Sequence, residues 1–397
     1  MPINDRSAIL SGARILLRCV CLALVGALIG GCATRPANVE MPFEAAARQA
    51  AESLLNQPVG LLGVVGRSSR RAVVLDPTLD AASGQQTFST QRLDQLIGEV
   101  AARRADDVQL LPFKAANLAQ ADHLLTGTLT RVDTAYRIDV ALVDLKNGRV
   151  VAQATALARR DGMNMNPLAY YRDSPLLVKD KVVEGYVRTS ALAPGQNADA
   201  AYLDRIATAT VINDATLLYN TARYREALGQ YRSALATPAG DQIRVLTGIY
   251  LSLAKLGQSA QAEEAFGRLV AYGIANNNLS IKFLFNPGTT EFWSDPKVSS
   301  AYAMWLRQIA RQTASTRSCV DILGHTSKTG AEVYNESLSL RRAVYIKQRL
   351  ASEAPAVGSR AHAVGMGWRD NIVGSGTDDV VDALDRRVEF TMTDCVK

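Results

Sequence analysis

Residues 319–344, CVDILGHTSKTGAEVYNESLSLRRAV, carry the most specific fold signal in the sequence. It opens with a strand at 319–323, turns through a loop at 324–330 and continues into YNESLSLRRAV at 334–344. Working outward, the sequence predicts an alternating strand at 279–285, a helix at 298–309, a strand at 361–367 and a closing segment at 385–390. These segments together predict one domain over residues 279–397.

Short motifs within this domain stand at fixed distances from one another. They read GHTS at 324–327, Gly330, YN at 334–335, LS at 338–339, RRA at 341–343 and DRRVE at 385–389. The set resembles the OmpA-like C-terminal family, whose members bind peptidoglycan. The resemblance implies a mixed β-sheet with helices on one face and a site for the diaminopimelate of a peptide stem. The site residues that it implies are Thr326, Ser327, Asn335, Arg342, Arg386 and Arg387.

The chemistry of the implied ligand explains why these residue types suit the site. Diaminopimelate carries a free ammonium and a free carboxylate on one carbon, so its site needs an acid, an arginine and orienting amides. By motif position Arg342 is the arginine, since a guanidinium makes two parallel charge-assisted bonds to a carboxylate. Asn335 is implied to orient the stem, and Thr326 lies in the loop at the strand end. Arg386 or Arg387 flanks the pocket or supports its loop.

The sequence departs from the family pattern at two positions. Ser327 stands where the pattern has the acid that grips the ammonium, and Asp385 stands where the last motif has Asn. Asp385 either supplies the missing negative charge or pairs with a neighbouring arginine. Three interpretations therefore stay open: a working diaminopimelate binder, a weak or altered stem binder, and a structural module.

The first residues predict a targeting signal. Three arginines precede an apolar run at 19–29, which is shorter than the roughly 20 residues that span a bilayer as a helix. The signal covers residues 1–31, and its end, IGGC, resembles the lipobox of bacterial lipoproteins. The resemblance implies that Cys32 carries the lipid, palmitate included. Because Ala33 follows rather than Asp, it also implies the periplasmic face of the outer membrane.

Five cysteines fit this compartment. Cys19 and Cys21 leave with the signal, and Cys32 is assigned to the lipid. Cys319 and Cys395 remain as an even pair in an oxidising compartment, so we predict a disulfide between them. The alternative is two buried free thiols.

Residues 57–160 predict an α/β sandwich, which follows a lipidated tether and short helix at 32–56. The sequence favours strands at 71–76, 108–113 and 121–129, a helix at 89–102 and a hairpin over 136–156. This order resembles the small N-terminal domain of TolB. It also resembles the curli-secretion and penicillin-binding-protein-activator lipoproteins.

The middle of the chain is predicted to be helical. After an irregular connector at 161–198, with a short helix near 178–188, residues 199–278 repeat three positions after 35 residues: Ala227, Tyr231 and Ala234 recur as Ala262, Phe266 and Leu269. The spacing matches the roughly 34-residue period of tetratricopeptide (TPR) helix pairs. This region is interpreted as a spacer or as a peptide-binding groove.

The composition of the chain excludes several classes of protein and of function. The chain has 397 residues, 48% of them hydrophobic and 21% charged, which excludes wholesale disorder, collagen and coiled coil. A formal charge of +6 is too diffuse for a dedicated nucleic-acid face, and three histidines leave little for catalysis or metal binding. We therefore expect a non-enzymatic outer-membrane lipoprotein without a cofactor that tethers the membrane to peptidoglycan. The alternative is an accessory lipoprotein of an envelope secretion, motility or cell-wall synthesis complex, which binds a protein partner through its N-terminal and TPR-like regions.

Overall fold

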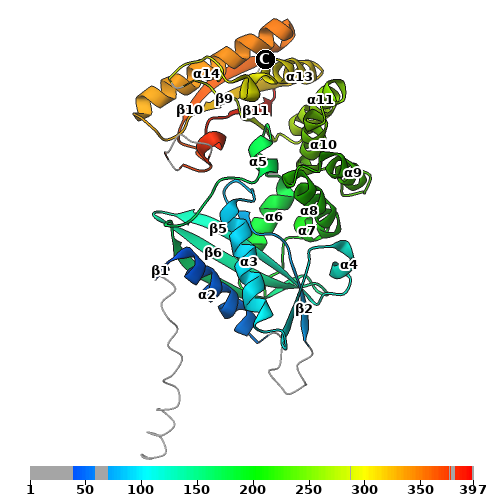
Figure 1. Cartoon of the computed structure of the whole chain (residues 1–397). Coiled ribbons are helices and arrows are strands. Elements are labelled where there is room, and N and C mark those ends of the chain that lie inside the picture. The colour runs from blue at the N-terminus through cyan, green and yellow to red at the C-terminus, as the bar shows by residue number, and fades with distance from the viewer. Residues whose placement is uncertain (1–38, 59–69, 287, 375, 377–380, 396–397) are drawn as a thin grey trace, which may run out of the picture. The chain divides into compact units, whose positions relative to one another are not determined.

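The computed structural model describes residues 39–58, 70–286, 288–374, 376 and 381–395 (Figure 1). The predicted signal at 1–31 and the predicted lipid-bearing Cys32 lie outside these ranges, so both stay predictions. None of the helices within the described ranges combines the length and the apolar character that a membrane crossing requires.

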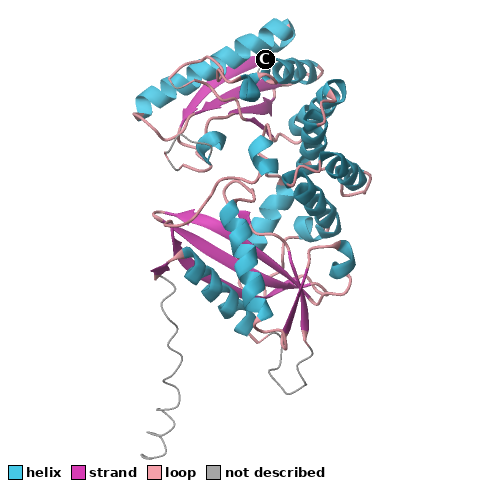
Figure 2. Ribbon diagram, viewed as in Figure 1, coloured by secondary structure: helices cyan, strands magenta, loops and turns pink. Residues whose placement is uncertain are grey.

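The larger of two sheets occupies the N-terminal part (Figure 2). Its strands follow the order β1-β7-β6-β5-β2-β4, and β3 also pairs with β5. Strands β5, β6 and β7 form an antiparallel meander, whereas β2 pairs in parallel with both β4 and β5. The strands are β1 (Glu40–Met41), β2 (Arg71–Leu75), β3 (Leu79–Asp80), β4 (Val108–Leu111), β5 (His123–Val132), β6 (Ala135–Asp144) and β7 (Arg149–Arg159).

Helices cover both faces of this sheet. Successive strand residues belong to different cores: Leu125 packs with α2 (Phe43–Asn56) and α3 (Phe88–Ala102), and Leu124 packs with α6 (Lys181–Ser190). Because neighbouring side chains of a strand point to opposite faces, these helices lie on opposite sides. The sandwich therefore extends beyond the predicted bounds of 57–160 and takes in α2 and α6.

The buried alanines of α2 explain how this helix packs against the large sheet. Ala46, Ala47, Ala50 and Ala51 are fully buried on one face of that helix, which contacts β6 and β7. Side chains this small let a helix approach a sheet closely. The sequence indicated the helix correctly, but its burial partner is a tertiary feature.

Antiparallel helices form the middle of the chain. α8 pairs with α9, α9 with α10 and α10 with α11. A Cβ at Gly248 on α10 would lie 2.3 Å from Cζ of Tyr231, so this glycine makes room for the ring. The helices from the sandwich to this region are α4 (Ala115–Leu118), α5 (Ala169–Asp173), α7 (Ala200–Leu203), α8 (Ile206–Asn220), α9 (Tyr224–Leu235), α10 (Ile243–Lys255) and α11 (Ser259–Ala275).

The second sheet has the order β10-β9-β11-β8, with β10 parallel and β11 antiparallel to β9. Its strands are β8 (Leu279–Ile281), β9 (Cys319–His325), β10 (Ala361–Gly367) and β11 (Val388–Thr393). Its helices are α12 (Pro296–Ser299), α13 (Tyr302–Ala314), α14 (Glu332–Glu353), α15 (Pro355–Gly358) and the 3-10 turn η1 (Val381–Leu384). A disulfide joins Cys319, at the start of β9, to Cys395.

Two predicted strands of this sheet differ in extent. The strand expected at 279–285 ends at Ile281, because Phe283 and Phe285 pack against Phe292 instead. The last strand begins at Val388 rather than at 385.

Candidate functional site

Two glycines bring α14 unusually close to the second sheet. A Cβ at Gly324 on β9 would lie 2.2 Å from the carbonyl oxygen of Ser339, and one at Gly365 on β10 would lie 2.7 Å from that of Glu336. Gly324 is the first residue of the GHTS motif, and Ser339 belongs to the LS motif. The motifs thus lie side by side because α14 contacts the sheet directly through the backbone at these glycines.

Arg342 lies on α14 and is 4% exposed. Its Nε donates to the carbonyl oxygen of Thr289 at 3.1 Å, and its Nη2 lies 3.4 Å from that of Asn286. The guanidinium also lies over the ring of Phe285, 4.8 Å from its centroid. The loop after β8 therefore covers this cation with carbonyl groups and an aromatic face.

The first two residues of the loop after β9, Thr326 and Ser327, are also buried. Asn335 donates from Nδ2 to the carbonyl oxygen of Thr329 at 2.9 Å, so its amide holds this loop. Ser327 is 6% exposed and Thr326 is 2% exposed. The Thr326 amide donates to the carbonyl of Gly367, while its buried hydroxyl has no hydrogen-bond partner among the described residues.

The two arginines of the last motif differ. Arg387 is buried and donates to the carboxylate of Glu389 at 2.7 Å and to the carbonyl oxygen of Asp370 at 3.1 Å. It therefore supports the loop after β10, one of its two predicted roles. Arg386 is half-buried. His325 is buried near Arg387, and this burial, with the arginine's charge, lowers its pKa to about 3.

Asp385 takes neither of its two predicted roles. Its carboxylate accepts three backbone N–H groups, from Ile372, Val373 and Gly374, at 2.7 to 2.9 Å. It is fully buried and shapes the loop that follows β10. A carboxylate engaged in this way holds a turn and does not replace the acid missing at Ser327.

The motif pattern implied Arg342 but did not indicate the loop that covers it. The carbonyls of Asn286 and Thr289 come from a segment 53 to 56 residues away, and backbone acceptors leave no mark in a motif. The sequence signal that was available is Pro287-Gly288 directly after a strand, which predicts a turn.

The comparisons with known proteins bear on this region. Residues 284–383 match the OmpA family model. The C-terminal part of the chain is an OmpA-family domain. A stretch of 84 residues is 36% identical to outer membrane porin F of Pseudomonas aeruginosa, covering 21% of this chain and 23% of that protein's length. The predicted resemblance of the C-terminal region is thereby confirmed, and those of residues 57–160 and 199–278 stay predictions.

Three solved structures are similar over about a third of the chain. The peptidoglycan-associated lipoprotein of Burkholderia pseudomallei is 23% identical with a TM-score of 0.24, covering 29% of this chain and 89% of that one. A putative MotB-like protein from Desulfovibrio vulgaris is 18% identical with a TM-score of 0.26, covering 35% and 98%. The C-terminal domain of LpoB from Escherichia coli is 10% identical with a TM-score of 0.22, covering 30% and 98%.

Proposed function

We propose that this chain is a non-enzymatic envelope lipoprotein that binds peptidoglycan through its OmpA-family domain. The observation that carries the proposal is a buried guanidinium, Arg342, at the arginine position of the family's motif. We further propose that the ligand is the diaminopimelate of a stem peptide, whose carboxylate Arg342 receives.

The backbone carbonyls that Arg342 contacts in this structure are the groups that a bound carboxylate would replace. Its Nε and Nη2 point at the carbonyls of Thr289 and Asn286. A ligand carboxylate is the stronger acceptor, because it carries a full negative charge and can accept two parallel bonds from the guanidinium. Binding therefore shifts the loop after β8 and exchanges neutral acceptors for a charged one.

Ser327 sets the expected affinity. A hydroxyl in place of a carboxylate leaves the ligand ammonium without its charged partner, which removes about 1.5–3 kcal/mol. That loss corresponds to roughly one to two decades in affinity. We propose that the lipid at Cys32 compensates, because confinement at the membrane raises the local concentration of wall ligand.

Cosedimentation on purified diaminopimelate-type sacculi tests the proposal, using soluble residues 33–397. The variant is Arg342→Ala and the matched control is its neighbour Arg341→Ala. Arg341 is exposed and bonds to Ser337 on its own helix. We expect wild type and Arg341→Ala to pellet and Arg342→Ala to stay in solution.

Circular dichroism of each variant guards against a folding defect. If Arg342→Ala is folded and still pellets, the proposed site is wrong. If folded wild type fails to pellet, wall binding itself is refuted for this domain.

A second candidate function is an accessory role in an envelope complex. A hollow of about 420 Å³ between α9, α10 and α11 favours it, with an apolar floor that includes Leu246, Ile249 and Leu253. Its rim carries Arg232 and Arg268. A pull-down of an envelope partner that persists in Arg342→Ala and is lost in Ile249→Asp supports this role.

A further inference from the structure

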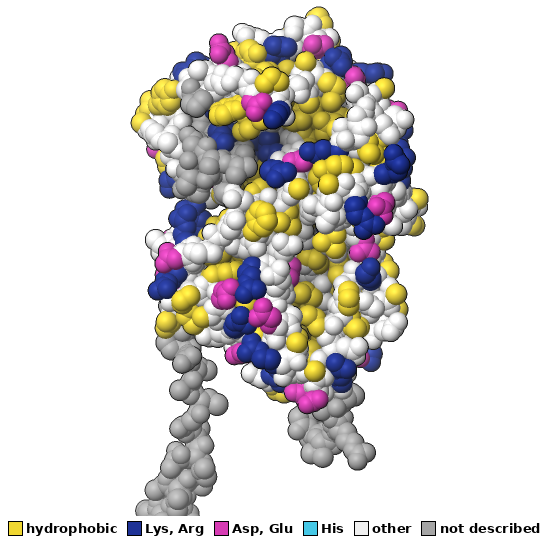
Figure 3. Space-filling view, in the orientation of Figure 1, with side chains coloured by type: hydrophobic (Ala, Val, Ile, Leu, Met, Phe, Trp, Pro, Cys, Tyr) yellow, Lys and Arg dark blue, Asp and Glu magenta, His cyan; other side chains and the backbone are white. Residues whose placement is uncertain are grey.

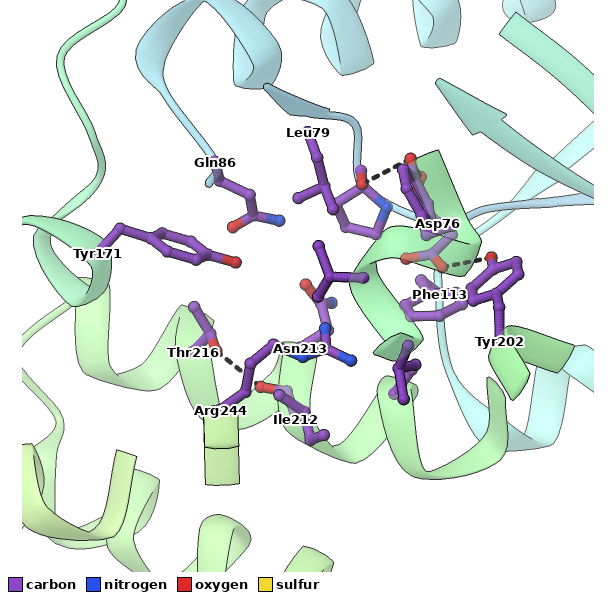
Figure 4. Close-up of a pocket in the computed structure, with 15 residues that line it drawn as sticks. Asp76, Leu79, Gln86, Phe113, Tyr171, Tyr202, Ile212, Asn213, Thr216 and Arg244 are labelled. Atoms are coloured by element: carbon purple, nitrogen blue, oxygen red, sulfur yellow. Dashed lines mark hydrogen bonds between the residues drawn. The ribbon is translucent and has the colours of Figure 1, made fainter. Parts of the chain in front are cut away.

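A second hollow lies where the end of β2 meets α6, α8 and α10, remote from the motifs of the OmpA-family domain (Figure 4). Its side chains come from segments far apart in the sequence. About 30 Å³ of it admits a water-sized molecule, against about 420 Å³ in the hollow between α9, α10 and α11. That space exceeds the roughly 10–15 Å³ that one water needs, so a group of a few atoms fits and a large ligand does not.

Arg244 brings a positive charge to this hollow. Its Nη2 donates to Oε1 of Gln242 at 3.1 Å, and its Nε is buried without a hydrogen-bond partner among the described residues. Across the described ranges no carboxylate lies within ion-pair distance of its guanidinium. The carboxylate of Asp76 lines the same hollow and attracts Arg244 from beyond ion-pair distance. A buried guanidinium N–H that lacks a hydrogen bond is costly, so the Nε of Arg244 favours an added acceptor.

Three neutral polar side chains reach the same space from other elements. They are Tyr171 of α5, Asn213 of α8 and Gln86 of the loop before α3, and Figure 4 shows their polar ends directed inward with Arg244. Within the described part of the chain, none of the three makes a side-chain hydrogen bond. The hollow therefore offers several unused donors around one cation.

The only acidic side chain that lines the hollow, among the described residues, is already engaged. Asp76 is 8% exposed, and its Oδ2 accepts from the hydroxyl of Tyr202 at 2.6 Å. Apolar side chains, including Leu79 and Ile212, form the remaining wall. The groups without hydrogen bonds are thus mainly donors around one guanidinium, and a small anion complements them.

We propose that this hollow is a binding site for a carboxylate group, held by Arg244 with Tyr171, Asn213 and Gln86. The guanidinium can make two parallel bonds to a carboxylate, and the amides and the hydroxyl complete its coordination. The site is separate from the one proposed at Arg342, so a failed test of one proposal leaves the other unaffected.

Binding of ¹³C-formate, followed by NMR line broadening, tests the site on the full-length chain in detergent. Formate is the smallest carboxylate, and formamide is the neutral probe of the same size. The variant is Arg244→Gln and the matched control is Arg225→Gln, an exposed arginine of α9 outside both hollows. We expect Arg244→Gln to weaken formate binding about tenfold or more. Arg225→Gln should leave it unchanged, and formamide should not bind.

If Arg244→Gln does not fold, Tyr171→Phe provides a second test of the proposed site. It removes only a hydroxyl that has no hydrogen bond within the described residues, and we expect formate to bind a few-fold more weakly. Equal binding by wild type, Arg244→Gln and Tyr171→Phe overturns the proposal. So does a wild type that leaves the formate line unchanged up to molar concentration.

Discussion

Asp76, at the end of β2, has its carboxyl group buried next to the hydroxyl of Tyr202. Burial raises the pKa of Asp76 to about 7, while the hydrogen bond from Tyr202 works against that rise. The sequence places Asp76 at the end of the strand predicted at 71–76. It could not identify a partner 126 residues away, because that contact exists only after folding.

The raised pKa makes the free energy of unfolding depend on pH. The native state holds the proton up to about pH 7, whereas the unfolded chain releases it near pH 4. The native state therefore binds more protons between these values, and this contribution to stability falls as pH rises. The total loss from this group is on the order of 4 kcal/mol.

Asp76→Asn should remove that dependence, since an amide does not ionise and can still accept from Tyr202. We expect the variant to be more stable than wild type at pH 8 and its stability to change less between about pH 4 and pH 7. Urea unfolding across this range measures both. Asp161→Asn is the control, because its side chain is 84% exposed. Parallel pH profiles for wild type and Asp76→Asn would contradict the argument.

Among the secondary-structure elements, the packing of α14 on β9 depends on the absence of a side chain at Gly324. A Cβ at Gly324 would lie 2.2 Å from the carbonyl oxygen of Ser339 and 3.3 Å from Cβ of Ala343. The first neighbour is helix backbone, which cannot rotate away. Any side chain at Gly324 must therefore push the whole helix off the strand.

We expect Gly324→Ala to lower the free energy of unfolding by about 1–3 kcal/mol, the usual effect of overpacking. It should also weaken wall binding, because α14 carries Arg342. The control is Gly229→Ala on α9, where a Cβ meets nothing within 4 Å. That change should stabilise by up to about 1 kcal/mol through helix propensity. Urea unfolding of both variants decides, and equal effects would refute the close-packing argument.

Elements whose side chains alternate or recur regularly could be predicted from the sequence. The strands at 71–75 and 108–111 and the hairpin of β6 and β7 lie where the pattern placed them. The short β8 could not be predicted, because Phe283 and Phe285 fit an alternating strand but pack into an aromatic cluster. Likewise, the motif pattern implied Arg342, but it could not indicate the backbone carbonyls that accept hydrogen bonds from its guanidinium.

At the scale of the whole molecule, the segment before α6 completes the second sheet. The amide of Leu177 donates to the carbonyl of Ser280 at 3.1 Å, and that of Lys282 donates to the carbonyl of Pro175 at 2.8 Å. Nζ of Lys282 bonds to the carbonyls of Tyr171 and Arg172. The free edge of β8 is thus covered by a segment about 100 residues earlier, outside the predicted domain of 279–397.

Leu176 is the side chain that anchors this segment, because it is fully buried and pairs with Ile281. We expect Leu176→Ala to destabilise the chain by about 2–5 kcal/mol through the cavity it leaves. It should lower the unfolding temperature of the OmpA-family domain even though residue 176 lies outside residues 284–383. Leu217→Ala is the matched control, since Leu217 is 47% exposed and a surface change of this kind stays within about 0.5 kcal/mol.

Calorimetry, with near-ultraviolet circular dichroism to follow the tryptophans, separates the possible results. The three tryptophans of the chain, Trp293, Trp305 and Trp368, all lie after residue 278. Trp293 and Trp368 report on the C-terminal domain, whereas Trp305 also reports on its contacts with Tyr250 of α10 and Phe266 of α11. If Leu176→Ala lowers the temperature at which their signal is lost, the connector and the second sheet unfold together. The connector is then part of the same folding unit as the OmpA-family domain. If the signal is lost at the wild-type temperature, the domain is independent of the connector and the β8 edge contact contributes nothing to its stability.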